Sequence, residues 1–126
     1  MKKKIDTIHA PKALGPYSQG IVHMTSKTLY VSGQTPIDPV TEGIPESIEE
    51  QTERCLLNIN AILEEAGLSM DDVMKTTVYL TNMDNFNKMN GIYGTFFKEP
   101  FPARVTVEVS RLSKNVDIEI DAIATF

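Results

Sequence analysis

Two segments near the end of the chain alternate apolar and polar residues with a period of two. In residues 101–109 the alternating apolar residues include Val105 and Val107, and in residues 116–121 they are Ile118 and Ile120. Successive side chains of a strand point to opposite faces, so each segment predicts a strand with one apolar and one polar face. We expect the apolar rows of both strands to face a helix-covered core.

The polar rows of these two strands place an arginine beside several carboxylates. One row holds Arg104, Thr106 and Glu108, and the row on the predicted neighbouring strand holds Asp117, Glu119 and Asp121. We expect both rows to share the sheet face that points away from the core. A guanidinium beside carboxylates on that face is either a solvated ionic ladder or the floor of a polar site, and the pattern leaves both readings open.

The rest of the chain predicts more strands and two helices. Residues 4–7, 18–24, 28–32 and 73–81 read as strands, the second and third joined as a hairpin. Ser47 and Glu50 form a capping box, and an apolar face then continues to Gly67, a helix stop. A second helix is predicted from residue 84 or 85 to residue 97. Its core stripe consists of Phe86, Met89, Tyr93 and Phe97, with Asn90 at the edge of the stripe.

This order of elements predicts one α+β domain over residues 1–126, with a mixed sheet of about six strands and two helices packed on one face. Two helices cover only one face of such a sheet. The other face commonly becomes an oligomer interface, where polar groups are paired, hydrated or used to hold a ligand. The pattern alone favours pairing or hydration of these groups.

Composition narrows the function class. The net charge is −5, and the only basic cluster is the terminal run Lys2 to Lys4, which argues against a nucleic-acid scaffold. Cys55 is the only cysteine and lies among apolar residues, so it is expected in the core. No leader segment or apolar run of membrane length is recognised, and we expect a cytoplasmic protein without a membrane partner.

The available chemistry is sparse. The sequence has no glycine-rich phosphate loop and no metal-ligand spacing, and its two histidines, His9 and His23, are expected at the surface. We therefore predict no metal and no cofactor. An arginine, carboxylates, hydroxyls and backbone amides near Gly33 suit the binding of a small carboxylate and the positioning of a water molecule.

An ordered set of segments resembles the Rid (YjgF) family and its RidA-type enamine/imine deaminases. The set extends over essentially the whole chain, and its members are residues 10–11, 15–20, 31–36, 75–80, 89–97, 102–109 and 118–120. The resemblance implies a chorismate-mutase-like fold of the bacillary type, assembled as a homotrimer with a central barrel. It also implies active sites in the clefts between subunits.

The resemblance assigns roles to individual residues. Arg104 matches the arginine that holds the substrate carboxylate, and Glu119 matches the glutamate that positions or activates the hydrolytic water. The matches to pocket-lining positions are Tyr17, Ser32, Gly33, Asn90 and Thr106. Many relatives have cysteine at the position of Thr106, and the loop at residues 98–100 is shorter than in some relatives. The first change is mild because no covalent step is expected, and the second affects the rim of the cleft.

The implied reaction is hydrolysis of 2-aminoacrylate, or of imines such as 2-iminopropanoate and 2-iminobutanoate, to 2-keto acids and ammonia. An imine carbon is already electrophilic, so orientation and one placed water suffice without a metal. Two other functions stay open: a non-catalytic module that binds a keto acid or amino acid, and a ribonuclease or translation inhibitor. Release of a keto acid from an imine by the purified protein would separate the deaminase from the non-catalytic module. Salt-dependent binding of RNA would support the ribonuclease or translation inhibitor.

Overall fold

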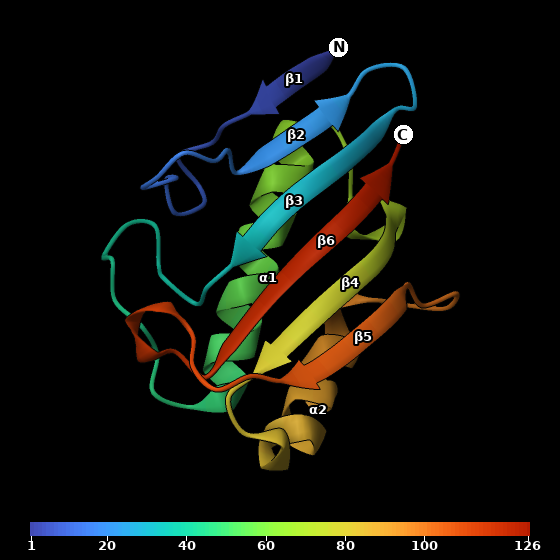
Figure 1. The fold of residues 1–126 in the computed structure, drawn as a ribbon. Coiled ribbons are helices and arrows are strands. Elements are labelled where there is room, and N and C mark those ends of the chain that lie inside the picture. The colour runs from blue at the N-terminus through green and yellow to red at the C-terminus, as the bar shows by residue number, and fades with distance from the viewer.

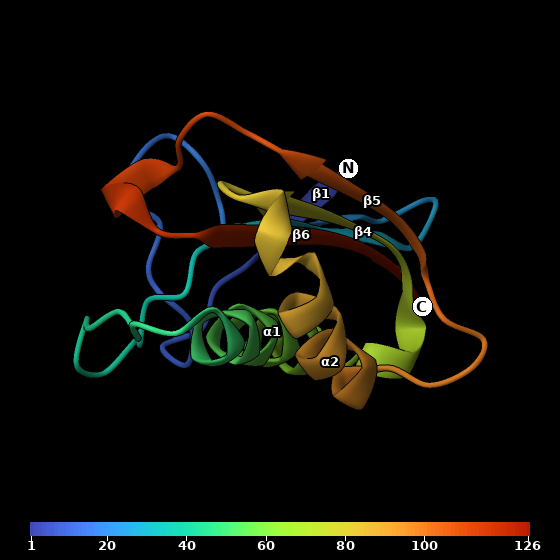
Figure 2. The ribbon, with the colours of Figure 1, turned by 90° about the horizontal axis from the view of Figure 1, so that it is seen from below.

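The computed structural model describes residues 1–126 as one six-stranded sheet with two α-helices on one of its faces (Figures 1 and 2). The strands are β1 (Lys2–Ile5), β2 (Gly20–His23), β3 (Thr28–Gln34), β4 (Val73–Leu80), β5 (Ala103–Glu108) and β6 (Ile118–Thr125). The α-helices are α1 (Ile48–Glu65) and α2 (Phe86–Phe96). Three short 3₁₀ turns are η1 (Met70–Asp72), η2 (Met83–Asn85) and η3 (Ser113–Asn115). The predicted α+β class and the helices on one face are confirmed.

The strand order is β1-β2-β3-β6-β4-β5. Only β4 and β5 pair in parallel, and every other pair is antiparallel, so the sheet is mixed as predicted. The expectation that β5 and β6 are neighbours is wrong, because β4 lies between them (Figure 1). A parallel β4–β5 pair requires a crossover connection, and α2 supplies it. The return from β5 through η3 then brings β6 to the far side of β4.

The sequence signals at the ends of α1 act as predicted. The Ser47 side chain accepts a hydrogen bond from the backbone N–H of Glu50, and the Ser47 hydroxyl also donates to the Glu50 carboxylate. Gly67 follows the helix with a φ of 82°, a left-handed conformation that glycine adopts without steric cost. Neither this helix nor α2 combines the length and the apolar character needed to cross a bilayer.

The core lies between the sheet and the two helices. It contains Ile118 and Ile120 of β6, packed with the apolar face of α1, and the α2 residues Met89 and Tyr93. Cys55 is fully buried here, and burial raises the pKa of its thiol well above the usual range. The thiol therefore stays protonated, and Cys55 is the core residue that the sequence predicted.

The face assignment of β5 differs from the prediction. In the parallel register Thr76 lies opposite Arg104 and Val78 opposite Thr106, and paired residues point to the same face. Thr76 and Val78 are buried against the helices, so Arg104 and Thr106 also lie on the helix side. Correspondingly, Val105 and Val107, expected in the core, lie on the uncovered face and are 43% and 37% exposed.

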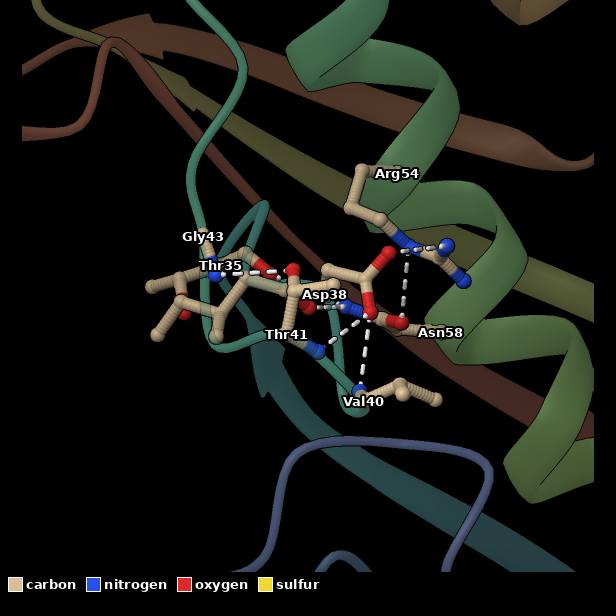
Figure 3. A network of polar contacts seen from close by, with 8 residues as sticks. Thr35, Asp38, Val40, Thr41, Gly43, Arg54 and Asn58 are labelled. Carbon is tan, nitrogen blue, oxygen red and sulfur yellow. Dashed lines mark hydrogen bonds and ion pairs between the residues drawn. The ribbon is translucent and has the colours of Figure 1, made fainter.

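A polar network fixes the loop that follows β3 onto α1 (Figure 3). The amide of the fully buried Asn58 donates to the carbonyls of Thr35 (3.1 Å) and Ile37 (3.0 Å). Its oxygen accepts a hydrogen bond from Nε of Arg54 at 3.2 Å, and the Arg54 guanidinium lies 3.7 Å from the Asp38 carboxylate. Asp38 in turn accepts from two backbone N–H groups of the loop. The loop is thus held by a network in which each named polar group has a partner.

Candidate active site

Arg104 forms the centre of one group of candidate residues, where β5 packs against α2. Its Nη1 donates a hydrogen bond of 2.8 Å to Oδ1 of Asn90, which lies on α2. This is the only hydrogen bond of the guanidinium, and the two ion pairs of the chain involve Arg54 and Lys98 instead. The half-buried cation therefore has no anionic partner within the subunit.

Aromatic rings of α2 support the same guanidinium. Cζ of Arg104 lies 4.8 Å from the ring centroid of Tyr93 and 5.5 Å from that of Phe86. Both distances are within the range of cation–π attraction. With two rings near Cζ and an amide on one nitrogen, the guanidinium keeps further N–H groups available for an anion.

Thr106 adds a second unpaired group two residues along β5. Its Oγ1 is buried and has no hydrogen-bond partner. Buried hydroxyls in folded proteins are paired in the large majority of cases, so an orphan of this kind indicates a missing ligand, water or partner chain. Arg104 and Thr106 lie two residues apart on the helix side of the same strand. The unpaired N–H groups of Arg104 and the unpaired hydroxyl of Thr106 are therefore neighbours on that face.

The second group of candidate residues lines a cleft of about 1010 Å³ at the far end of β3. Tyr17, Gly33 and Glu119 all line it, together with residues of the loops that follow β1 and β3. The loop after β3 is the one held by Asn58, so this wall of the cleft has a fixed position. Tyr17 is largely exposed, and its ring is available to a bound molecule.

Gly33 allows the Glu119 carboxyl to approach the backbone of β3. A Cβ added at Gly33 would lie 2.9 Å from Cδ of Glu119 and closer still to Oε2. The pairing of β3 with β6 shifts register between Val31 and Gln34, which places Gly33 in an irregular part of the ladder. Any side chain at this position would displace the carboxyl group.

Burial and a neighbouring charge modify the acidity of Glu119. Partial burial is the larger effect and raises the pKa of its carboxyl, and the negative charge of Asp121 raises it further. Asp121 itself is well supplied with donors: it accepts from the backbone N–H of Thr77 at 3.0 Å and from the Tyr79 hydroxyl at 3.2 Å. Of the two carboxylates, Glu119 is the one suited to exchange protons with a substrate or a water.

Ser32 adjoins this group, but its hydroxyl is already used. Its Oγ donates to the carbonyl of Ser18, and its backbone N–H donates to the carbonyl of Gln19 at 2.9 Å. Gln19 is buried and its amide donates to the carbonyls of Thr7, Ala10 and Pro11. These contacts hold the segment that carries Tyr17, so the visible role of Ser32 is to position that segment.

The two groups lie on opposite faces of the sheet. Glu119 lies opposite Tyr79 across the β6–β4 pair and alternates with the buried Ile118 and Ile120, so it points away from the helices. Arg104 points toward α2. The expectation that Arg104 and Glu119 share one face, in a ladder or in a site, is therefore wrong for a single subunit. One small molecule cannot contact both side chains of the same subunit.

Sequence reasoning missed the second use of Tyr93 and Phe86. Both were assigned to the core stripe of α2, and Tyr93 is indeed buried, yet both rings also lie against the Arg104 guanidinium. The one signal in the sequence was Asn90, a polar residue placed three positions before Tyr93 on the same helix face.

The chain is similar to known proteins over almost its whole length. The family model described as Endoribonuclease L-PSP matches residues 7–126. A RutC family protein of Pyrococcus horikoshii is 54% identical, with 98% of each chain covered. The 2-iminobutanoate/2-iminopropanoate deaminase of Escherichia coli is 44% identical, again over 98% of each chain. The crystal structure of E. coli TdcF with bound serine superposes with a TM-score of 0.92 at 42% identity and covers 98% of both chains.

Proposed function

The chain belongs to the Rid (YjgF) family, and on that premise we propose that it is an imine deaminase. Its substrates would be 2-imino acids such as 2-iminobutanoate and 2-iminopropanoate, which water converts to 2-keto acids and ammonia. The observation that carries the proposal is the unpaired Arg104 guanidinium, held by Asn90 and by aromatic rings but by no carboxylate. A planar guanidinium pairs bidentately with the carboxylate that every such substrate has.

We further propose that the complete site forms between two subunits of a homotrimer. Arg104 and Glu119 of one chain lie on opposite faces of its sheet, so a site that contains both needs two chains. The uncovered face supports such an assembly because it exposes apolar side chains, with Tyr30 at 49% in addition to Val105 and Val107. A subunit that buries this face against its neighbours would remove the apolar surface from water.

In the proposed cleft, Arg104, Thr106 and Glu119 each have a separate role in the reaction. Arg104 of one subunit would hold the substrate carboxylate, and Thr106 beside it would give its unpaired hydroxyl to a bound molecule. Glu119 of the next subunit would take a proton from the attacking water and return it to the leaving nitrogen. Its raised pKa suits this exchange, because a group that titrates nearer to neutrality serves as both base and acid.

The test begins with the purified wild-type protein and imines generated in situ by a threonine dehydratase acting on threonine. We expect release of the 2-keto acid faster than spontaneous hydrolysis. We also expect Arg104→Ala and Glu119→Gln to be nearly inactive alone, yet to regain activity when co-expressed in mixed trimers. About a quarter of the clefts would then combine both native residues, since each cleft draws on two subunits independently.

The deaminase proposal and the shared-site proposal are each contradicted by a different result. An absence of accelerated keto-acid release would reject the deaminase proposal. A monomer in light scattering, or mixed variants that remain as inactive as either parent, would reject the shared site. In that case the two residues could not serve one substrate, whatever the activity of the wild-type protein.

One alternative has an observation in its favour. TdcF, whose fold the chain shares, was crystallised with bound serine, which is consistent with a module that binds amino acids or keto acids without turnover. The assay above separates binding from hydrolysis. The net charge of −5 gives no support to RNA as the substrate, and salt-dependent RNA binding would be the contrary observation. A cytoplasmic location remains a prediction from the sequence.

A further inference from the structure

Tyr93 lies directly beneath the guanidinium of Arg104. The distance from Cζ to the ring centroid is 4.8 Å, and only 5% of Tyr93 is exposed. The ring therefore acts as a buried platform for the guanidinium. Cation–π attraction at such a desolvated site is stronger than at the surface.

Tyr93 is itself held on both sides. Its hydroxyl forms a hydrogen bond of 2.7 Å with Oγ1 of Thr76, a residue that is 1% exposed. Its ring packs against that of Phe97 with centroids 4.7 Å apart. Thr76 pairs with Arg104 in the β4–β5 register, so the ring is fixed by the strand next to the one that carries the arginine.

Together with Asn90, this ring restricts how the guanidinium can lie. Asn90 accepts from Nη1 and the ring lies 4.8 Å from Cζ, which leaves Nε and Nη2 as the donors available to an anion. A carboxylate that approaches edge-on receives two parallel N–H donors, whereas one that approaches the face receives none. The platform thus determines the geometry as well as the position of the anion site.

We propose that Tyr93 is a positioning residue that sets the plane of Arg104 for edge-on binding of a carboxylate. It would act through Arg104 and without contact to the reacting atoms. This inference rests on the proposed role of Arg104 as the substrate anchor and extends it to the residue that orients the anchor. It does not depend on whether the bound carboxylate is then hydrolysed.

The experiment compares Tyr93→Leu, Tyr93→Phe and the matched control Phe96→Leu, also on α2. Tyr93→Leu removes the platform and should weaken binding of 2-oxobutanoate and L-serine, measured by calorimetry, by roughly two- to thirtyfold. In turnover it should raise KM more than it lowers kcat. Tyr93→Phe keeps the ring, so it should restore affinity to within about threefold of the wild type. Phe96→Leu removes another aromatic ring that packs against the core but stacks on neither Arg104 nor Tyr93, and it should lower Tm but leave affinity unchanged.

A spectroscopic measurement tests the stack directly. The ring current of Tyr93 should displace the Arg104 Hε resonance, and the displacement should persist in Tyr93→Phe and shrink in Tyr93→Leu, where only the more distant Phe86 ring remains. Wild-type affinity in Tyr93→Leu, or an equal loss in Phe96→Leu, would overturn the inference. So would a wild-type protein that binds neither carboxylate. If carboxylate binding depends on Tyr93 but no imine is hydrolysed, the positioning role stands and the deaminase proposal fails.

Discussion

The loop after β3 and the surroundings of Arg104 are both polar, but they differ in how completely their groups are paired. In the loop network, Asn58, Arg54 and Asp38 bind one another and the backbone, as Figure 3 shows. Around Arg104, the guanidinium has one neutral hydrogen-bond partner, and the Thr106 hydroxyl has none. Both regions lie in the same chain, and each contains an arginine.

This difference distinguishes polar groups that stabilise the fold from polar groups that are available to a ligand or a partner chain. A paired network offsets the cost of removing its polar groups from water, and such a network stabilises a fold without needing anything further. An unpaired cation and an unpaired buried hydroxyl leave that cost uncompensated until a ligand or a partner chain arrives. Substitutions at five positions test this contrast, from the largest expected effect to the smallest.

Glu119→Gln should lower kcat/KM for imine hydrolysis by about 10²–10⁴-fold, because the amide keeps the shape of the carboxyl but cannot accept the proton. The raised pKa of Glu119 also predicts a pH profile. Wild-type activity should fall as the pH drops through that raised pKa, and the residual activity of Glu119→Gln should lack this limb. Rates measured across pH 4 to 8 check both statements.

The same substitution should also change how stability depends on pH. As the pH rises, the variant should gain stability relative to the wild type, whereas it loses activity relative to the wild type. A carboxyl whose pKa is raised in the folded state stabilises the fold below its unfolded pKa, and this contribution is lost as the pH rises through the folded pKa. The Tm of Glu119→Gln relative to the wild type should therefore increase from acid to neutral pH. A constant difference would mean that the folded state does not shift this pKa.

Gly33→Ala should lower kcat by roughly 100-fold, since the added methyl group must displace the Glu119 carboxyl by a distance comparable to 1 Å. The control is Gly94→Ala on α2, where an added Cβ meets nothing within 4 Å. That variant should retain activity and gain up to about 1 kcal/mol in the free energy of unfolding. Equal losses in both variants would remove the special role of Gly33.

Arg104→Ala should weaken binding of 2-oxobutanoate by roughly ten- to a hundredfold, the loss expected for a charge-assisted contact. Arg104→Lys should recover little of this, because an ammonium lacks the planar fork. Arg54→Ala serves as the matched control from the paired network and should cost about 1 kcal/mol of stability without changing affinity. If Arg54→Ala reduced binding as much as Arg104→Ala, pairing would not distinguish the two regions.

Asn58→Ala should reduce the free energy of unfolding by about 1–3 kcal/mol, because it leaves the carbonyls of Thr35 and Ile37 buried without donors. Asn60→Ala, two positions along α1, removes only an exposed hydrogen bond to Glu64 and should change stability by less than about 0.5 kcal/mol. Chemical denaturation measures both. Comparable values for the two asparagines would contradict the importance of the loop network.

Thr106→Val should have the smallest effect. The hydroxyl has no partner within the subunit, so its removal should leave the stability of the subunit unchanged or slightly raised. Activity should fall by no more than the equivalent of about 0.5–1.5 kcal/mol, the value of one neutral hydrogen bond. Complete loss of turnover in a folded variant would make Thr106 chemically essential, and a marked loss of stability would mean that its hydroxyl is paired after all.

Much of the fold could be predicted because its signals are local. Ser47, Glu50 and Gly67 determine the limits of α1 through backbone hydrogen bonds and one left-handed residue. The alternation in β4 separates the buried Val78 from Tyr79 on the opposite face. These patterns depend on neighbours within a few residues, and tertiary contacts did not override them.

The candidate site was only partly predictable. Arg104, Asn90 and Thr106 do lie together, and Tyr17, Gly33 and Glu119 line one cleft. Their separation into two groups was not foreseen, and neither was the platform made by Tyr93. The hydroxyl of Ser32, expected in the pocket, donates instead to the carbonyl of Ser18.

The sequence by itself determined which residues of β5 share a face, because alternation with a period of two is a property of any extended chain. It could not determine which of the two faces meets the helices. Val105 and Val107 are more apolar than Arg104 and Thr106, so burial alone favoured the valines for the core. Only the tertiary structure decided otherwise: the parallel register with β4 turns Arg104 toward α2 and leaves the valines on the uncovered face. That register depends on contacts between residues far apart in the chain, which no local pattern encodes.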